Sequence, residues 1–439
     1  MFHLDLSKAP TQNFNSPESV LFYLGSKAIQ ASLPQEAVIR SLQKLSIRGN
    51  VILLSIGKAA YPMAAAATEI LKSQIQSGLI LTKYGHAGKP IPPLETMEAG
   101  HPIPDANSIL GGRRILNLCS QLRPEDTVLV LLSGGGSSLA EVPFGDLTLE
   151  DLVYWNKMLL ESGAPIQDVN EIRILLSSLK GGGLLSKILP AKSVTLILSD
   201  VIGDDLSKVA SGPTIPSLTN KNSILRIFQQ YNIPPNDTML RLLEDKIKKE
   251  GESPINIEPS RNSIYCIGNL GLAMEMIQKE CTHLTIPVLF LTSSLSCEAK
   301  EAGFFLAEIA KEYSKNRTSP LLILCGGETI VTHDGSGKGG RNQELALSFA
   351  KRIAGHSGIS LLSLATDGTD GPTDAAGAFV NGNTWEKIQS VSDADLALKR
   401  HRSYEALQSA DALVRTGPTG TNVNDIQFIW IDTKEKNRN

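Results

Sequence analysis

The feature that most constrains the fold of this chain is a set of short, continuous apolar runs that each end in a glycine-rich or polar turn. Residues 51–57, 127–132 and 194–199 are such runs, and their unbroken apolar character is typical of strands buried on both faces of a parallel sheet. Stretches with helical periodicity lie between them. Strands that alternate with helices predict an α/β fold with mostly parallel sheets. Ligands bind beyond the carboxyl ends of such strands, so the residues directly after each run are the first candidates for a functional site.

The chain is long enough for two domains. Its 439 residues exceed one ordinary core, and a polar, charged stretch at residues 236–261 is typical of a helix end followed by a linker. We therefore expect one α/β domain over residues 1–250 and a second over residues 251–439. Strands of the second domain are expected at residues 263–268, 287–292, 320–325, 360–365 and 427–431.

Composition and charge exclude several classes of protein. A formal net charge of -3 gives no reason to expect binding to nucleic acid, and no apolar run approaches the ~18 residues of a membrane span. The N-terminus lacks the basic and apolar regions of a signal peptide. Five cysteines without a C-x-x-C pair favour a reducing compartment and argue against a structural zinc. We expect a cytoplasmic protein whose partners are small molecules, and a homodimer remains open.

Residues 335–344, with the sequence GSGKGGRNQE, place four glycines around one lysine and directly before one arginine. A β-like run at residues 328–333 precedes this loop, and a helix-like run at residues 342–353 follows it. Glycine allows close approach of a ligand to backbone amides, and free amides at a helix N-terminus form an anion site. The pattern predicts a cradle for a phosphate whose charge changes during a reaction, and a flexible hairpin tip with solvated charges is the alternative. The expected binding residues are Lys338, Gly339, Gly340, Arg341 and Asn342.

A second glycine loop, SGGGSS, directly follows the apolar run 127–132. Its amides and hydroxyls suit a phosphate or a carboxylate, and a tight strand–helix turn is the alternative. The spacing of a nucleophile elbow, G-x-S-x-G, fails at Leu139. Lys58 ends the run 51–57 and can act on phosphate as a point charge, although a surface lysine fits the sequence equally well. The candidates from the loop are Ser133, Gly134, Gly135, Gly136, Ser137 and Ser138.

Carboxylates form a third group of candidates. Asp200 follows the run 194–199, and Asp204 and Asp205 lie one turn later. Mg²⁺ is usually held by one or two carboxylates plus substrate oxygens, and a kinase aspartate can accept the proton of a substrate hydroxyl. Asp200 and Asp204 are therefore candidates for metal binding and for catalysis. Capping of a helix by Asp204 or Asp205 is the alternative.

Three further polar segments lie at the ends of expected strands in the second half. Glu328 comes shortly after residues 320–325, and Asp367 comes directly after residues 360–365 in a stretch with two more aspartates between glycines. Such aspartates suit Mg²⁺ or a nucleotide hydroxyl, and turn-forming aspartates are the alternative. The segment TGPTGTN precedes the last expected strand and resembles a further phosphate cradle. The candidates from these segments are Glu328, Asp367, Thr419 and Asn422.

Nucleotide-binding motifs of other classes match poorly. The chain contains no Walker A motif. Gly335, Gly337 and Gly340 satisfy G-x-G-x-x-G, which alone is weak evidence for a dinucleotide site. A dinucleotide site has no need of Lys338 or Arg341, whereas phosphoryl transfer uses such cations to stabilise the charge on the moving group.

The order of these motifs resembles the type 2 glycerate kinase family, also called the MOFRL family. The matching segments extend from Lys58 to Asp425 and cover nearly the whole chain. In the first half they are GKA at residue 57, HPIPD, SGGGSS, LKGGG and SDVIGDDLSKVASGPT. In the second half they are GGETIVT, GKGGRNQELAL, TDGTDGPTDAAGA and TGPTGTNVND.

This resemblance implies phosphorylation of D-glycerate to 2-phosphoglycerate, dependent on ATP and Mg²⁺. It also implies a Rossmann-like N-terminal domain, a C-terminal MOFRL-type domain and an active site in the cleft between them. The family's catalytic lysine and arginine correspond to Lys58 and Arg341, and its important aspartate corresponds to Asp200 or Asp204. Relatives often carry basic residues where this chain has Ile174, Leu175 and Gly183, so the contacts with the glycerate carboxylate stay open.

Two other functions remain as hypotheses. One is an NAD(P)H-dependent hydroxypyruvate reductase, supported by G-x-G-x-x-G and by names given to some members of the family. The other is a non-catalytic nucleotide-binding regulator. Cations at several strand ends argue against a regulator, because binding alone does not require them.

Overall fold

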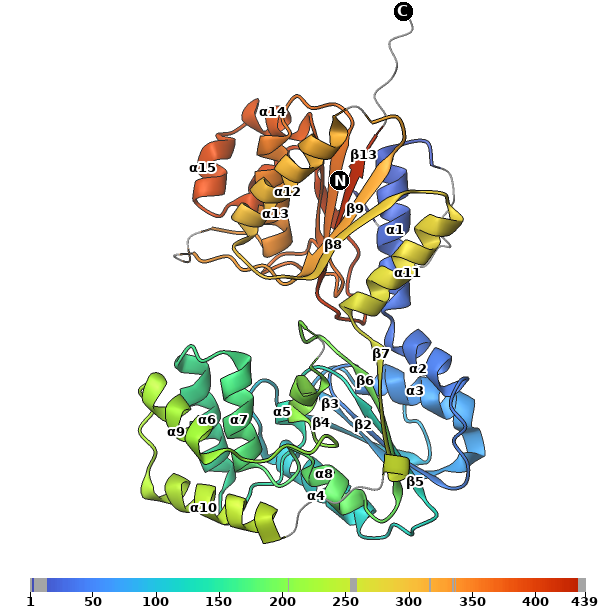
Figure 1. The fold of residues 1–439 in the computed structure, drawn as a ribbon, viewed down its shortest axis with the longest axis vertical. Coiled ribbons are helices and arrows are strands. Elements are labelled where there is room, and N and C mark those ends of the chain that lie inside the picture. Colours follow the sequence, from blue (N-terminus) through green and yellow to red (C-terminus); the bar gives the residue numbers. More distant parts are fainter. Residues whose placement is uncertain are drawn as a thin grey trace, which may run out of the picture. The chain divides into compact units, whose positions relative to one another are not determined.

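The computed structural model describes residues 2–3, 14–203, 205–252, 259–315, 317–333, 335 and 337–432. The chain forms two compact units. One unit comprises residues 34–267, and the other combines residues 1–33 with residues 268–439. Each unit contains its own sheet, and the ribbon of Figure 1 shows helices packed against both sheets. We call them the central unit (34–267) and the split unit (1–33 with 268–439).

The central unit is a Rossmann-like layer of six strands in the order β4-β3-β2-β5-β6-β7. Neighbours from β4 to β6 pair in parallel. Counted from β2, this is the order 3-2-1-4-5-6 of the doubly wound dinucleotide fold, whose switch point lies between β2 and β5. The carboxyl ends of β2 and β5 are therefore where a ligand is expected. The strands are β2 (Val51–Ile56), β3 (Ile75–Lys83), β4 (Leu94–Ala99), β5 (Thr127–Leu132), β6 (Lys192–Leu198) and β7 (Asn262–Gly268).

Helices cover this sheet, and several begin at caps that the sequence provides. Asp105 and Ser108 form a capping box at the start of α4, and Thr148 and Asp151 form one at the start of α6. A second apolar core around Trp155 joins α6, α7, α9 and α10, which form a group beside the sheet in Figure 1. The helices are α2 (Pro34–Leu42), α3 (Ala60–Leu71), α4 (Ala106–Cys119), α5 (Gly136–Leu139), α6 (Leu149–Glu161), α7 (Ile166–Leu176), α8 (Gly183–Ile188), α9 (Lys221–Gln230) and α10 (Asp237–Glu252), with 3-10 turns η1 (Lys72–Gln74), η2 (Leu206–Ser211) and η3 (Pro259–Arg261).

The split unit contains a seven-stranded sheet in the order β1-β12-β11-β10-β13-β9-β8. Five strands share one direction, whereas β11 and β13 run against their neighbours. Because β13 lies between β9 and β10, its first residue, Asp425, stands level with the carboxyl ends of both neighbours. The strands are β1 (Phe2–His3), β8 (Val288–Leu295), β9 (Leu321–Gly327), β10 (Ile359–Ala365), β11 (Gly377–Asn381), β12 (Leu413–Arg415) and β13 (Asp425–Ile431).

Helices cover both faces of this second sheet. In Figure 1, α12 and α13 lie on one side, and α1 and α11 lie on the other. The α1 helix joins the unit through its apolar face and through a hydrogen bond from the Tyr23 hydroxyl to Glu280 of α11. The helices are α1 (Pro17–Ala31), α11 (Leu270–His283), α12 (Ala299–Ser314), α13 (Arg341–Arg352), α14 (Thr384–Gln389), α15 (Ala394–Lys399) and α16 (Ser403–Ser409).

The fold class agrees with the sequence prediction, but the boundary between the units differs from residue 250 in two places. The run at residues 263–268 forms β7, which adds to the central sheet beside β6. Residues 1–33 belong with the C-terminal sheet. The polar stretch from residue 236 is largely the amphipathic helix α10, whose apolar residues enter the second core of the central unit. Up to residue 252 the polarity reflects a solvated helix face, and the expected linker falls mostly on residues 253–258, which lie outside the described residues.

Candidate active site

The carboxyl ends of β2 and β5 are joined by backbone hydrogen bonds that fix the segment carrying Lys58. The amide of Lys58 donates to the carbonyl of Gly134 at 2.9 Å, and the amide of Ala59 donates to the Ser133 hydroxyl at 3.0 Å. The Ser133 amide in turn donates to the Ile56 carbonyl at 3.1 Å. The two segments that the sequence analysis predicted separately thus form one structure at the switch point. Ser133 is buried and acts as part of this frame.

The glycine loop after β5 lies tightly against its neighbours. A Cβ atom on Gly134 would stand 2.2 Å from Oδ2 of Asp200, so only glycine lets this carboxylate approach the loop backbone. A Cβ atom on Gly135 would stand 3.0 Å from the His101 ring and 3.1 Å from Cγ of Lys58. Lys58, His101 and Asp200 therefore surround the same two glycines. This cluster combines a cation, an imidazole and a carboxylate at one strand edge.

His101 was noted in the sequence only as part of the HPIPD segment. Burial, together with the nearby charge of Lys58, lowers the pKa of His101 to about 4. The ring is therefore neutral near pH 7 and can exchange hydrogen bonds without adding charge.

The segment after β6 supplies Asp200 and a short turn. Asp205 accepts hydrogen bonds from the Ser207 amide at 3.1 Å and from the Ser207 hydroxyl at 2.5 Å, so it caps η2 as the structural alternative predicted. Asp204 lies outside the described residues. Asp200 stands at a strand end beside the glycine loop and fits the usual pattern of Mg²⁺ sites, in which one or two carboxylates act with substrate oxygens. Among the described residues, no group of three or more histidines, cysteines or carboxylates is arranged to hold a metal ion by itself.

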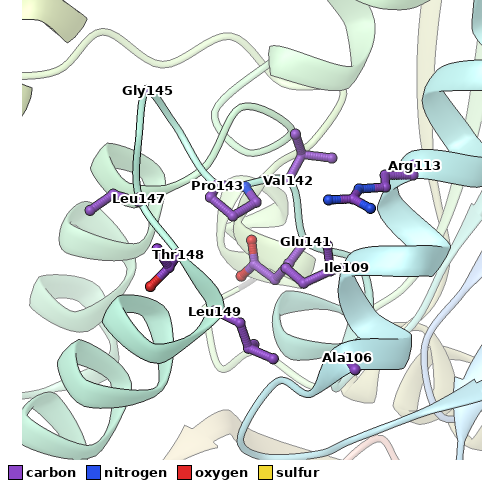
Figure 2. A pocket seen from close by; sticks show the side chains of 10 residues that line it. All are labelled: Ala106, Ile109, Arg113, Glu141, Val142, Pro143, Gly145, Leu147, Thr148 and Leu149. Atoms are coloured by element: carbon purple, nitrogen blue, oxygen red, sulfur yellow. The ribbon is translucent and has the colours of Figure 1, made fainter.

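A pocket of about 590 Å³ lies beside this region, between α4 and the segment from Glu141 to Leu149. Figure 2 shows the Glu141 carboxylate between Ile109 on one side and Pro143 and Thr148 on the other. Glu141 is 1% exposed and forms an ion pair with the buried Lys180. The sequence analysis did not single out this pair, since neither residue stands at a strand end.

Arg341 in the split unit is held by two carboxylates. Its Nε and Nη2 atoms donate to Asp425 at 2.6 and 3.1 Å, and Nη1 donates to Glu328 at 2.5 Å. Asp425 is 1% exposed, whereas the Arg341 side chain is 31% exposed. The two carboxylates raise the pKa of Arg341, and burial raises the pKa of Asp425 to about 7 against the attraction of Arg341. Arg341 is thus a fixed, permanently charged group at the edge where β9 and β10 end.

The sequence analysis treated two acidic residues near Arg341 differently from what the structure shows: it named Asp425 only as the end of a matching segment, and it included Asp370 among the aspartates suited to Mg²⁺ or a nucleotide hydroxyl. Asp425 ends the segment TGPTGTNVND and begins a buried strand, and a charge at the first position of such a strand was the signal available. Asp370 is 2% exposed and accepts hydrogen bonds from the Asn342 and Gln343 amides at 3.1 and 2.8 Å. These are amides of the first turn of α13.

The position of Asp370 contradicts the expectation that the first amides of α13 form an anion site. The carboxylate occupies two amides that we expected to hold a phosphate, so those amides are not available to a ligand. Asn342 is fully buried, and its Oδ1 accepts a hydrogen bond from Ser363 at 2.7 Å. Its position in the structure is that of a core residue. The sequence could not show this, because the partner carboxylate lies 28 residues further along the chain.

The glycine loop itself rests on the segment that leads into α16. The Tyr404 amide donates to the Lys338 carbonyl at 3.1 Å, and the Lys338 ammonium lies 4.3 Å from the centroid of the Tyr404 ring. A Cβ atom on Gly339 would stand 2.1 Å from Oγ of Ser403, and a Cβ atom on Gly340 would stand 2.3 Å from Cγ of Asp370, so neither position has room for a side chain. Residues 337–340 are therefore packed in place, in contrast to the flexible hairpin tip considered as the alternative, whereas Ser336 lies outside the described residues.

The remaining candidates lie on two loops that bind each other. The Thr419 amide donates to the Asp367 carbonyl at 3.2 Å, and the Thr419 hydroxyl donates to the Thr366 carbonyl at 2.6 Å. Asp367 accepts from the Thr369 amide at 2.9 Å, which is the turn-forming arrangement. Asn422 accepts from the Asn424 amide at 3.1 Å. Asp367, Thr419 and Asn422 thus shape the same strand edge that presents Arg341 and Glu328.

The G-x-G-x-x-G segment does not stand where a dinucleotide-binding fingerprint stands in a fold. Residues 328–333 form no strand, and β9 already ends at Gly327, which leaves a long connection before α13 begins at Arg341. A dinucleotide fingerprint requires the glycines directly after a strand and at the opening of its helix.

Comparison with known proteins finds two family models that match different parts of the chain. A family model described as a domain of unknown function, DUF4147, matches residues 21–244, and the MOFRL family model matches residues 321–425. A protein of Thermotoga maritima named D-glycerate 2-kinase is 44% identical over 91% of this chain and 95% of its own length. The chain belongs to the type 2 glycerate kinase family.

Other members of the family support this assignment. A glycerate 2-kinase of Pyrococcus horikoshii is 38% identical over 94% of this chain and 96% of its own length. The crystal structure of glycerate kinase from Thermotoga maritima matches with a TM-score of 0.88, at 42% identity over 94% of this chain and 100% of that one. A protein of Agrobacterium vitis with a provisional hydroxypyruvate reductase name is 38% identical. Among the helices that the structure describes, none is long and apolar enough to cross a membrane.

Proposed function

We propose that this protein transfers a phosphoryl group from ATP to D-glycerate and forms 2-phosphoglycerate. The observation that carries the proposal is the arrangement at the switch point of the central unit, where Lys58 and Asp200 meet one glycine loop. Phosphoryl transfer needs positioned cations more than covalent chemistry. The names of the relatives that share most of this chain agree with the proposal.

In this proposal Lys58 and Arg341 are the catalytic cations. Lys58 is held through its backbone at the ends of β2 and β5, and Arg341 is held through its side chain by Asp425 and Glu328. Both groups are positioned before substrate arrives, so they stabilise developing negative charge without reorganising. Lys338 assists as a third cation.

The carboxylates after β6 have two roles in this proposal: they accept the proton of the reacting hydroxyl, and they bind the metal ion. Mg²⁺, when bound, neutralises phosphate charge. Asp200 would hold it together with substrate oxygens, and Asp200 or Asp204 would accept the hydroxyl proton. The glycine loop at residues 133–138 would contact the substrate, and the segments that contain Asp367, Thr419 and Asn422 would contribute to the phosphate site of the split unit.

The test is an enolase-coupled assay that detects 2-phosphoglycerate directly. We expect the purified protein to consume ATP only when both D-glycerate and Mg²⁺ are present. In a magnesium titration, Asp200→Asn should shift the requirement to higher concentration or abolish turnover. Failure of the wild-type protein to form 2-phosphoglycerate would refute the proposal.

The reductase hypothesis is the second candidate, and the provisional names of the Agrobacterium vitis proteins are what favours it. The same preparation can be tested with hydroxypyruvate and NADH or NADPH. We expect no oxidation of either nucleotide, because no strand leads directly into the G-x-G-x-x-G segment. Robust oxidation without an ATP-dependent product would support the reductase in place of the kinase.

A further inference from the structure

Three consecutive residues at the end of η2 adopt left-handed backbone conformations, and two of them are not glycine. The φ angles are 51° at Ala210, 58° at Ser211 and 61° at Gly212. Such conformations cost free energy for residues with a Cβ atom and persist where the surroundings impose them. The carbonyls of Ser211 and Gly212 accept hydrogen bonds from the Gly181 and Gly182 amides at 3.0 and 2.8 Å. This left-handed turn is therefore clamped between two glycine loops.

The turn packs against the loop after β5 and is hydrogen-bonded to it through side chains. The Cβ atom of Ala210 lies 2.7 Å from the place where a Cβ atom on Gly136 would stand. The Ser211 hydroxyl, which is fully buried, lies 3.0 Å from the Ser137 hydroxyl and 2.9 Å from Oδ1 of Asn170. Asn170, Ser211 and Ser137 thus form one hydrogen-bonded chain that ends at the candidate substrate loop.

The direction of each hydrogen bond among Asn170, Ser211 and Ser137 follows from the number of protons that each side chain can donate. The carbonyl oxygen of Lys208 lies 3.5 Å from Nδ2 of Asn170. A carbonyl oxygen can only accept a hydrogen bond, so the side-chain nitrogen of Asn170 must be the atom that faces Lys208. The Oδ1 atom of Asn170 therefore faces Ser211. The single hydroxyl proton of Ser211 is therefore donated to Asn170. The bond between the serines must then run from Ser137 to Ser211. Ser137 has used its only proton and offers lone pairs alone to any ligand.

A serine oxygen that can only accept is unsuited to a phosphate or carboxylate oxygen and suited to a hydroxyl donor. Of the proposed substrates, D-glycerate carries one hydroxyl that reacts and a second, on C3, that does not. Ser137 is two residues from Gly135, which lies against Lys58, the proposed cation for the transferred phosphoryl group. The C3 hydroxyl lies one carbon from the reacting one, whereas the ribose hydroxyls of ATP are separated from the transferred group by two phosphates.

We propose that Ser137 accepts a hydrogen bond from the C3 hydroxyl of D-glycerate, and that Ser211 and Asn170 are positioning residues that fix Ser137 as an acceptor. This inference rests on the proposed function. It also changes the expected role of Ser137 from an anion-binding group to a group that recognises a hydroxyl. The proposal makes residues 133–138 the loop that contacts glycerate.

The experiment compares D-glycerate with D-lactate, which lacks only the C3 hydroxyl and is measured as a competitive inhibitor of the intact enzyme. We expect Ser137→Ala to raise the KM for D-glycerate about 10–100-fold, the usual effect of leaving one hydrogen bond unmade. The inhibition constant of D-lactate should stay within about twofold, because D-lactate has no such bond to lose. The KM for ATP should not change.

Two further variants separate the hydroxyl of Ser211 from its backbone. Ser211→Ala and Ser211→Gly both remove the hydroxyl, but only glycine relaxes the left-handed backbone. We expect both to raise the KM for D-glycerate by a similar factor, smaller than that of Ser137→Ala, although their thermal stabilities differ. Ser186→Ala, which removes an exposed hydroxyl on α8, is the control and should leave every constant unchanged.

Several outcomes would overturn the inference. They are an unchanged KM for D-glycerate in Ser137→Ala, an equal weakening of D-lactate, a change confined to ATP, or a change confined to the magnesium requirement. In each of these cases the kinase assignment survives, because wild-type turnover is measured alongside. A wild-type protein that does not phosphorylate D-glycerate would refute both the assignment and the inference.

Discussion

Lys58 depends on its backbone for its position. Its amide is bound to Gly134, and its side chain passes the glycine that also meets His101. Arg341 shows the opposite arrangement, since its guanidinium is held by two carboxylates. Backbone hydrogen bonds thus fix the point from which the Lys58 side chain extends, whereas the guanidinium of Arg341 is itself held by Asp425 and Glu328.

We expect Lys58→Met to lower kcat about 10²–10³-fold, the usual effect of removing one contact to transition-state charge. The fold should persist, because the backbone bonds of residue 58 remain. Lys192→Met is a matched control, since Lys192 is an exposed residue that begins β6. Activity of Lys58→Met within about threefold of wild type, at equal thermal stability, would remove Lys58 from the mechanism.

We expect Asp425 to produce an acid limb in the pH profile of the enzyme, that is, a fall of kcat at low pH. It faces Arg341, Asp370 and the side-chain amide of Asn342, and burial raises its pKa to about 7. As the pH falls through about 7, Asp425 takes up a proton and loses its ion pair with Arg341. We therefore expect kcat to decline on the acid side of this pKa.

The variant Asp425→Asn should remove that acid limb and lower kcat by about 10–100-fold at pH 8, because Arg341 loses its charged support. Glu328→Gln serves for comparison and should have a smaller effect, since Glu328 is 44% exposed. An acid limb that persists unchanged in Asp425→Asn would assign it to another group.

At the scale of elements, the site depends on how loops meet helices and turns. The left-handed turn at Ala210 fits only because Gly136 has no side chain. The first turn of α13 is capped by Asp370 from the loop after β10. In both cases residues far apart in the sequence determine whether a glycine loop can take its conformation.

A double-mutant cycle measures the contact between the loop and the turn. Gly136→Ala should reduce the free energy of unfolding by about 1–3 kcal/mol, as overpacking usually does. Ala210→Gly removes the opposing methyl group, so the double variant should recover at least about 1 kcal/mol of that loss. Urea denaturation of the four proteins gives the coupling energy. Additive effects of the two changes would show that the surroundings absorb the added methyl group.

These elements also show how much of the fold and of the candidate site could be predicted from the sequence. The strands at residues 51–56 and 127–132 and the helix after residue 341 were predictable, because continuous apolar runs and helical periodicity are local signals. Lys58, Asp200 and Arg341 could be predicted as candidates because each stands just after an apolar run or at the start of a helix. The partners of Asp370, Asp425 and His101 lie in distant segments, so a local pattern could mark these residues but could not show what they contact.

At the scale of the whole molecule, the two units divide the chain unevenly. The central unit is one continuous segment, and the split unit needs both the first 33 residues and everything after residue 267. The strand β7 lies within the segment that the sequence suggested as the start of a second domain, yet it completes the central sheet.

We expect a fragment of residues 34–267 to fold by itself and to unfold in one cooperative transition, since it holds a complete sheet and two apolar cores. A fragment of residues 1–250 should be less stable, because it lacks β7 and carries α1 without β10, β13 and α11, on which α1 packs. Circular dichroism during heating compares the two. Equal melting temperatures would favour the boundary near residue 250.

The place of β13 in its sheet has a consequence for synthesis on the ribosome. This strand lies in the middle of the sheet, between β9 and β10, yet it follows all the other strands of that sheet in the chain. Until it emerges, β9 and β10 have no common neighbour, and the apolar face of α1, made long before, has no finished surface to cover. The nascent chain must therefore keep a helix and two hydrophobic strands from aggregating while the central unit is already able to fold. Translation speed and chaperone binding over the last part of the message should influence the yield of active enzyme more than they do over the first.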